Sequence, residues 1–268
     1  MIKTKTRMAS AILALMGFTF LPGAAAAHFQ LVYSPQTTLH RPGDVPLLLA
    51  FWHPFENGHA MDMGQPLEFF SVFKGEKIDL MGTLAPATFK GANNEAAAFT
   101  ATLPVKRNGD YIVALTPAPY YEGSEDIYIQ QITKAYFNKN GIPSGWNAPL
   151  GLPTEIVPLN KPTNILAGST FTGQLLSEGK PVAGAEIEIE YLAAAPDMAT
   201  LAASAPSVGP MPGGAVVAIT DANGLFTFGI PKAGQWGFAA LGTGPATEYD
   251  GKELSQDAVI WITAHDVE

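Results

Sequence analysis

Short apolar segments, each ended by glycine or proline, constrain the fold of this 268-residue chain more than any other feature. The chain contains 27 glycines and 22 prolines, and their spacing leaves little room for long helices. In residues 69–73 and 111–115 apolar side chains recur at every second position, which is the spacing of a half-buried strand. The sequence therefore predicts an all-β protein.

Six such segments lie in the first half of the chain and six in the second half. They are residues 29–33, 45–52, 67–73, 97–103, 109–116 and 128–137, then 169–176, 185–192, 215–220, 225–230, 235–241 and 258–264. Six or seven strands over roughly 130 residues are typical of an immunoglobulin-like sandwich. The second set predicts another compact sandwich, in which Asn223 and Gly224 would form a tight hairpin turn.

The domain boundary is predicted in residues 142–162, where the strand periodicity stops and prolines recur. Proline lacks a backbone donor and restricts φ, so this stretch is expected to be an extended, mostly irregular and stiff linker. An N-terminal, metal-binding sandwich would span residues 28–141 and a C-terminal sandwich residues 163–268.

Residues 1–27 have the pattern of a secretory signal peptide. Lys3, Lys5 and Arg7 precede an apolar run at 8–21, and four alanines end at Ala27. Such a signal peptide would direct export of the protein and would then be removed, and we expect a periplasmic location. Later segments are too short to span a membrane, which requires roughly 20 apolar residues.

The acidic composition argues against a nucleic-acid partner. Loss of the leader would remove three basic residues and no acidic one, which moves the formal net charge from −9 to −12. Nucleic-acid binding requires clustered lysine and arginine. The chain has no cysteine, so disulfides and thiolate metal ligands are both excluded.

Three of the five histidines lie where a metal ion could be bound. Cleavage after Ala27, or one or two residues earlier, would leave His28 at or near a free α-amine, and amine and imidazole together chelate nickel or copper. His53 and His59 follow the segment 45–52, in a loop that also contains Met61. The end of that segment and the start of the first one are expected on one rim of the sandwich.

The other histidines and the remaining polar residues suggest no catalytic chemistry. His40 lies in a turn and His265 ends the last predicted strand, and both are interpreted as surface residues. No serine, carboxylate pair or glycine-rich loop has the spacing of a known catalytic motif. We therefore expect a binding protein rather than an enzyme.

The second half resembles the carboxypeptidase-regulatory-like, or transthyretin-like, modules of exported proteins. The residues that carry the resemblance are 179–185, 220–226 and 234–236. This likeness implies a sandwich fold and says little about function, because such modules serve as spacers or docking surfaces.

The whole mature chain resembles the NikK-like periplasmic nickel-binding components, a family of exported proteins of formally unknown function found near nickel and cobalt uptake systems. The matching motifs are residues 27–30, 53–56, 58–63, 118–122, 132–134, 145–146 and 151–159. The resemblance implies Ni²⁺ ligands at His28, His53 and His59, with Met61 as an optional fourth. It also implies that a membrane nickel or cobalt transporter receives the ion.

Two other functions compete with this interpretation. The first is that of a structural or adhesive exported β-sandwich protein that binds no metal. The terminal histidine is also similar to that of CopC-type copper proteins and of copper polysaccharide monooxygenases, so a copper-binding protein or copper oxidase is a minor alternative. Imidazole nitrogen binds Cu²⁺ more tightly than Ni²⁺ or Co²⁺, so ligand type alone does not select the metal.

Overall fold

The computed structural model of the protein describes residues 28–209 and 216–267, which fold into three β-sheets. The predicted all-β class is confirmed, since the helical structure in these ranges is a single short 3₁₀ turn, η1 (Met81–Thr83). No helix in the described part of the chain is long and apolar enough to cross a membrane. The predicted signal peptide, at residues 1–27, lies outside the described residues.

The first sheet has seven strands in the order β1-β3-β8-β7-β18-β17, with β4 paired to β3. Their bounds are β1 (Phe29–Tyr33), β3 (Gly43–Trp52), β4 (Ala60–Met61), β7 (Ala85–Lys90), β8 (Glu95–Val105), β17 (Pro196–Asp197) and β18 (Ala202–Ala203). The two short strands β17 and β18 come from the second half of the chain and extend a sheet built by the first half.

The second sheet has twelve strands, with a main path β19-β16-β21-β23-β11-β9-β5-β6. Their bounds are β5 (Glu68–Phe73), β6 (Glu76–Asp79), β9 (Gly109–Thr116), β11 (Ile127–Lys139), β16 (Glu186–Tyr191), β19 (Val216–Ile219), β21 (Gly234–Ala240) and β23 (Lys252–His265). Four short strands pair at its margins: β2 (Thr38–Leu39), β10 (Tyr120–Glu122), β13 (Ile165–Leu166) and β22 (Glu248–Tyr249).

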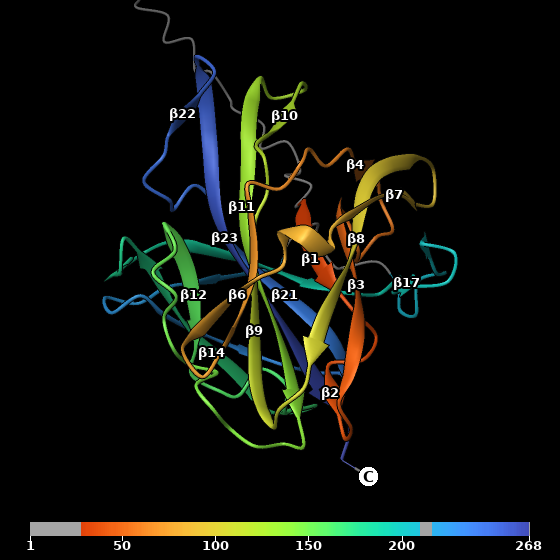
Figure 1. Cartoon of the computed structure of the whole chain (residues 1–268). Helices are drawn as coiled ribbons and strands as arrows, with labels where there is room; N and C mark the ends of the chain where they lie inside the picture. The colour runs from red at the N-terminus through yellow and green to blue at the C-terminus, as the bar shows by residue number, and fades with distance from the viewer. Residues whose placement is uncertain (1–27, 210–215, 268) are drawn as a thin grey trace, which may run out of the picture.

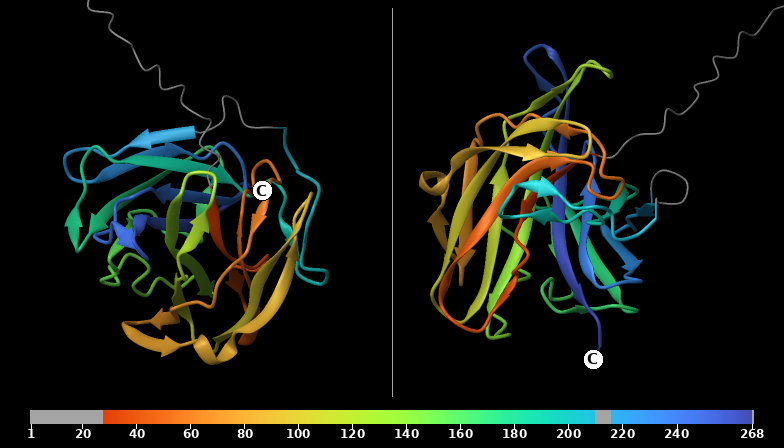
Figure 2. Two further views of the ribbon diagram at one scale, coloured as in Figure 1. Left: turned by 90° about the horizontal axis from the view of Figure 1, so that it is seen from above. Right: turned by 90° about the vertical axis from the view of Figure 1, so that its right-hand side faces the viewer.

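The two halves of the chain meet within this sheet. β11 of the first half and β23 of the second run parallel, from Tyr128 opposite Leu254 to Ala135 opposite Trp261. Figure 2 shows the first half, drawn in red to yellow-green, beside the second half, drawn in green to blue, and the strand order β21-β23-β11-β9 joins the two halves through β23 and β11. The halves therefore share one continuous sheet.

The third sheet has four strands and includes part of the predicted linker. Its strands are β12 (Thr154–Pro158), β14 (Thr170–Ser177), β15 (Lys180–Pro181) and β20 (Leu225–Gly229). All five residues of β12 are buried and pair with β14. Residues 142–153 of the predicted linker are irregular as expected. Residues 154–158 instead form a buried strand.

The predicted hairpin at Asn223 and Gly224 is wrong, although the turn itself is present. Gly224 has a φ of 71°, and Asp221 Oδ1 accepts the backbone N–H groups of Asn223 and Leu225. The strands on either side pair elsewhere, β19 with β16 and β20 with β14. The turn therefore links two sheets, because turn residues fix the local chain reversal and not the partner of the next strand.

Three main apolar cores hold the sheets together. One fills the N-terminal sandwich and contains Phe69 and Phe137, and another fills the C-terminal sandwich and contains Phe171 and Phe238. The third core joins Phe29 and other residues of the seven-stranded sheet to residues of β21 and β23. The start of β1 is thus packed against the second half of the chain.

Candidate metal-binding site

The pairing of β1 with β3 places His28 beside His53. The two strands are antiparallel with Phe29 opposite Trp52, so the residue before Phe29 lies across from the residue after Trp52. The centroids of the two imidazole rings are 4.3 Å apart. Two residues 25 positions apart in the sequence therefore come together at the rim of the first sheet.

The backbone of His28 is held by a buried amide of the central sheet. Its carbonyl accepts a hydrogen bond of 2.7 Å from Gln131 Nε2, and Gln131 Oε1 accepts the Gln30 N–H at 2.8 Å. The same Gln131 Nε2 lies 3.2 Å from Asp257 Oδ2, on the neighbouring strand β23. The next residue, Phe29, is fully buried, so the chain that carries His28 is fixed on both sides.

The loop after β3 is closed by short hydrogen bonds. Gly58 N–H donates to the His53 carbonyl at 3.0 Å, and Trp52 Nε1 donates to the Gly58 carbonyl at 3.1 Å. A Cβ at Gly58 would lie 2.9 Å from His53 Cβ, so this close approach requires glycine. The Phe55 N–H donates to Glu190 Oε2 at 2.9 Å, which ties the loop to β16 of the second half.

Glu122, at the end of β10, is the nearest carboxylate to His28. Its Oε2 lies 3.6 Å from His28 Nε2. Its Oε1 accepts hydrogen bonds from the Ser124 hydroxyl at 2.6 Å and the Ser124 N–H at 2.9 Å. These two hydrogen bonds lower the pKa of Glu122, and the positive charge that His28 and His59 can carry lowers it further.

Burial lowers the pKa of His28 from 6.5 to about 4, and repulsion from His53 adds to this effect. The carboxylate of Glu122 acts in the opposite direction but does not compensate. His28 is therefore neutral near pH 7. A neutral imidazole keeps a nitrogen lone pair for a metal ion or a hydrogen bond.

The other two predicted ligands have different surroundings. His59 is exposed, and its Nε2 lies 3.5 Å from Asn94 Nδ2. Met61 is only 2% exposed and belongs to the apolar core of the N-terminal sandwich. The structure thus brings His28 and His53 together, places His59 on the same loop, and packs the Met61 thioether in the core.

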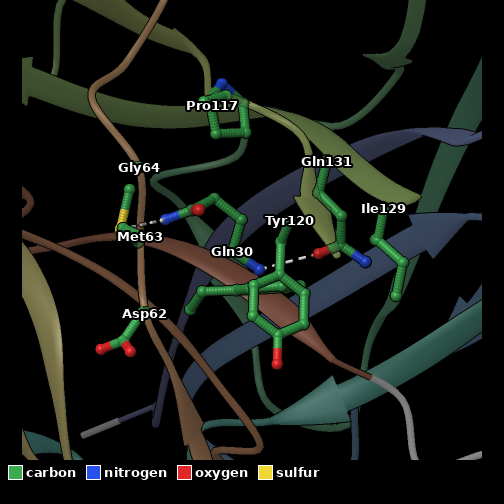
Figure 3. A pocket seen from close by; sticks show the side chains of 10 residues that line it. Gln30, Asp62, Met63, Gly64, Pro117, Tyr120, Ile129 and Gln131 are labelled. Carbon is green, nitrogen blue, oxygen red and sulfur yellow. Dashed lines mark hydrogen bonds between the residues drawn. The ribbon is translucent and has the colours of Figure 1, made fainter. Parts of the chain in front are cut away.

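A cavity of about 10 Å³ lies next to this site, enough for about one water molecule. It is lined by Gln30, Phe51, Asp62, Met63, Tyr120, Gln131 and neighbouring residues. Figure 3 shows the Gln30 amide directed at the Met63 sulfur and the Gln131 amide at the Gln30 backbone. Phe51 lines this cavity, and the centroid of its ring lies 5.5 Å from that of the His28 ring.

Side chains alone do not form a complete metal cage. Within residues 28–209 and 216–267, no group of three or more histidine, aspartate or glutamate side chains has an arrangement that could hold a metal ion. The predicted cleavage after Ala25, Ala26 or Ala27 falls outside the described residues. The pair of histidines would therefore need further donors, such as an α-amine or a repositioned His59.

The fold and this geometry define an all-β sandwich protein with a histidine pair at the start of its first strand. The chain belongs to the family described as a domain of unknown function (DUF4198), whose model matches residues 25–244. No curated protein matches the sequence.

The similarities to solved structures concern the β fold alone. The adhesin InvE of Yersinia pseudotuberculosis is 15% identical over 89% of this chain and 59% of its own, with a TM-score of 0.23. Trypsin-activated α-2-macroglobulin from Escherichia coli is 10% identical over 90% of this chain and 16% of its own, with a TM-score of 0.25. This chain thus spans less than two thirds of either. BcpA, the major pilin subunit of Bacillus cereus, is 12% identical over 90% and 68%, with a TM-score of 0.21.

Two residues that position the site have no signal in the sequence. Gln131 is one of two adjacent glutamines within a long strand, and Glu190 is one of three glutamates in an alternating segment. Their roles depend on the sheet that joins the halves of the chain. Glu122 does have a signal in the sequence, because it lies in an aromatic and acidic segment at residues 120–126.

Proposed function

We propose that this protein binds a divalent transition metal ion at His28 and His53, with Ni²⁺ as the expected ion. The observation that carries the proposal is the 4.3 Å separation of the two imidazole rings. The lowered pKa of His28 supports it, because the ligand does not have to lose a proton at neutral pH. Glu122, with Oε2 3.6 Å from His28 Nε2, would contribute negative charge beside the ion.

The remaining metal-binding groups would be an α-amine created by removal of the leader and side chains of the loop between β3 and β4. Removal of the leader would create an α-amine at or near His28, which can bind the same ion as the imidazole. His59 is exposed and can approach if the loop between β3 and β4 moves. Met61 would reach the ion only if the core opened, so it is the weakest member of the predicted set.

The physiological setting follows from the expected leader and the family resemblance. An exported protein would capture Ni²⁺, free or as a small chelate, in the periplasm and deliver it to a nickel or cobalt transporter. Cu²⁺ and Co²⁺ are the alternative ions, because histidine nitrogen does not exclude them. We propose a binding role and no catalytic one.

A structural or adhesive β-sandwich without a metal is the competing function. In that case the two histidines would serve only to pack the rim, where the His28 ring makes tilted contacts with the rings of His53 and Phe51. The two functions differ in one measurable property, which is specific metal affinity.

Calorimetric titration of the processed protein with Ni²⁺, Cu²⁺ and Co²⁺ tests the proposal. Variants His28→Ala and His53→Ala are each expected to weaken Ni²⁺ binding at least about tenfold, the effect of losing about 1.4 kcal/mol of binding free energy. His59→Ala should have a smaller effect.

The matched control is His40→Ala, which removes an exposed histidine that precedes β3, whereas His53 follows the other end of that strand, and it should leave the affinity unchanged. Mass spectrometry must first establish the mature N-terminus. Weak binding that is the same in all four variants would leave the structural function as the better explanation.

A further inference from the structure

Two hairpins extend together beyond one end of the sandwich. One is formed by β10 and β11 and the other by β22 and β23, and Figure 1 shows them side by side at the top of the molecule. They stay together because β11 and β23 pair in parallel as far as Tyr128 and Leu254. We call residues 120–128 and 248–253 the hairpin tip.

The hairpin tip carries three tyrosines whose rings contact one another, one pair tilted and the other edge to face. Tyr128 lies in the middle, with ring centroids 5.3 Å from Tyr121 and 4.9 Å from Tyr249. The outer two are 41% and 46% exposed, among the most exposed large apolar side chains in the described residues. Tyrosine rings exposed in this way present large contact area at low entropic cost, as they do in protein interfaces.

Acidic residues predominate in the hairpin tip. The hairpin tip has one basic residue, Lys252, and six acidic residues: Glu122, Glu125, Asp126, Glu248, Asp250 and Glu253. Its formal charge is therefore −5. In the described ranges, no ion pair joins Glu125, Glu248 or Glu253 to a basic side chain.

Lys252 shows how this surface binds a cation. Its ammonium group pairs with Asp126 and lies 5.3 Å from the centre of the Tyr121 ring. The tip therefore already contains one cation held jointly by a carboxylate and a tyrosine face. Among the described residues, no such cation lies over the Tyr249 ring or beside Glu125, Glu248 or Glu253.

We propose that the hairpin tip is a docking surface for a basic, arginine- or lysine-rich segment of a partner protein. Charge complementarity selects the partner, because a segment of positive charge would neutralise the tip and stack on the tyrosines. Glu122 belongs both to the tip and to the surroundings of His28, so a docked partner would lie next to the metal site. The docking does not require a metal ion.

The test uses metal-free, isotope-labelled protein in chelator, titrated with a synthetic arginine-rich peptide at about 0.15 M salt, where the Debye length of about 8 Å screens long-range attraction. Amide chemical-shift changes are expected in residues 120–128 and 248–253. A peptide of the same length with glutamine in place of arginine should cause none.

Two double variants separate the contribution of the tyrosine rings to peptide binding from that of the carboxylates. Tyr121→Ser with Tyr249→Ser keeps every charge and should weaken binding roughly tenfold, the sum of two cation–π contacts. Glu125→Gln with Glu248→Gln should weaken it similarly, whereas the control Glu76→Gln with Glu95→Gln, which removes exposed charges elsewhere, should not.

Shift changes spread over the whole surface, or equal affinity of the tyrosine variant and the unmodified protein, would overturn the docking surface. Both results are independent of nickel affinity. A failure here therefore leaves the metal site untouched, and a failure of metal binding leaves this inference untouched.

Discussion

Raising the pH from 6.5 to 8.5 is expected to destabilise this protein, because two buried glutamates on β16 hold protons in the folded state. Burial raises the pKa of Glu190 to about 8 and that of Glu188 to about 7. Glu190 accepts a hydrogen bond from the Phe55 N–H, and Glu188 Oε2 has no hydrogen-bond partner within the described residues. Neither carboxylate has a basic partner to compensate its charge there.

The sign follows from linkage between proton binding and folding. A carboxyl group whose pKa is raised in the folded state binds more protons folded than unfolded, so stability falls as pH rises towards the folded pKa. One pH unit between 6.5 and the folded pKa corresponds to about 1.4 kcal/mol of unfolding free energy. Above pH 6.5 the protein therefore loses about 2 kcal/mol of stability through Glu190 and about 0.7 kcal/mol through Glu188. Below pH 6.5 the lowered pKa of His28 acts in the opposite direction, since stability then rises with pH.

Thermal unfolding at pH 6.5, 7.5 and 8.5 measures the effect. A loss of 2–3 kcal/mol corresponds to a decrease in Tm of roughly 5–10 °C for a chain of this size. Glu190→Gln keeps an oxygen for the Phe55 N–H but cannot ionise, so its Tm should fall by only a small part of that amount. Glu125→Gln, at an exposed position, is the control. A Tm that stays constant or rises over this range, or an unchanged pH slope in Glu190→Gln, would refute the reasoning.

Three further outcomes are expected. Gly58→Ala should displace the His53 side chain, because the new Cβ would lie 2.9 Å from His53 Cβ, and calorimetry should show weaker Ni²⁺ binding. Lys134→Met and Glu155→Leu should each cost about 3–5 kcal/mol in urea unfolding, since each leaves an unpaired charge where the two side chains are 1% and 2% exposed, whereas the double variant should cost clearly less than the sum. NMR titration should place the His28 pKa near 4, and His53→Ala should raise it because one source of repulsion is removed.

The strands were predictable because a strand with one buried face has apolar residues at alternating positions in its own sequence. The juxtaposition of His28 and His53 was also within reach, because it requires only that the first two long strands pair as neighbours. The contacts that the first half makes with the second half were not predictable in this way. The parallel pairing of β11 with β23 joins residues more than 120 positions apart, and no local pattern specifies it.

The expectation that Met61 binds the metal also shows that a local sequence pattern does not specify tertiary contacts. A methionine two residues after a histidine, on a loop rich in donors, is equally suited to bind a metal or to fill a core. The pairing of Met61 with Phe51 across β4 and β3 decides for the core, and that pairing depends on how the loop returns to the sheet.

The histidine pair is also supported by the second half of the chain. Gln131, which holds the His28 carbonyl, is itself bonded to Asp257 on β23, and the His53 loop is tied to Glu190 on β16. Asp257 and Glu190 are both buried, and both would be lost with the second half. A sandwich cut at residue 141 would therefore keep both candidate ligands and the β1–β3 pairing that places them together, but lose these two supporting contacts. The second half thus acts as a scaffold for the site, in addition to any role in docking a partner.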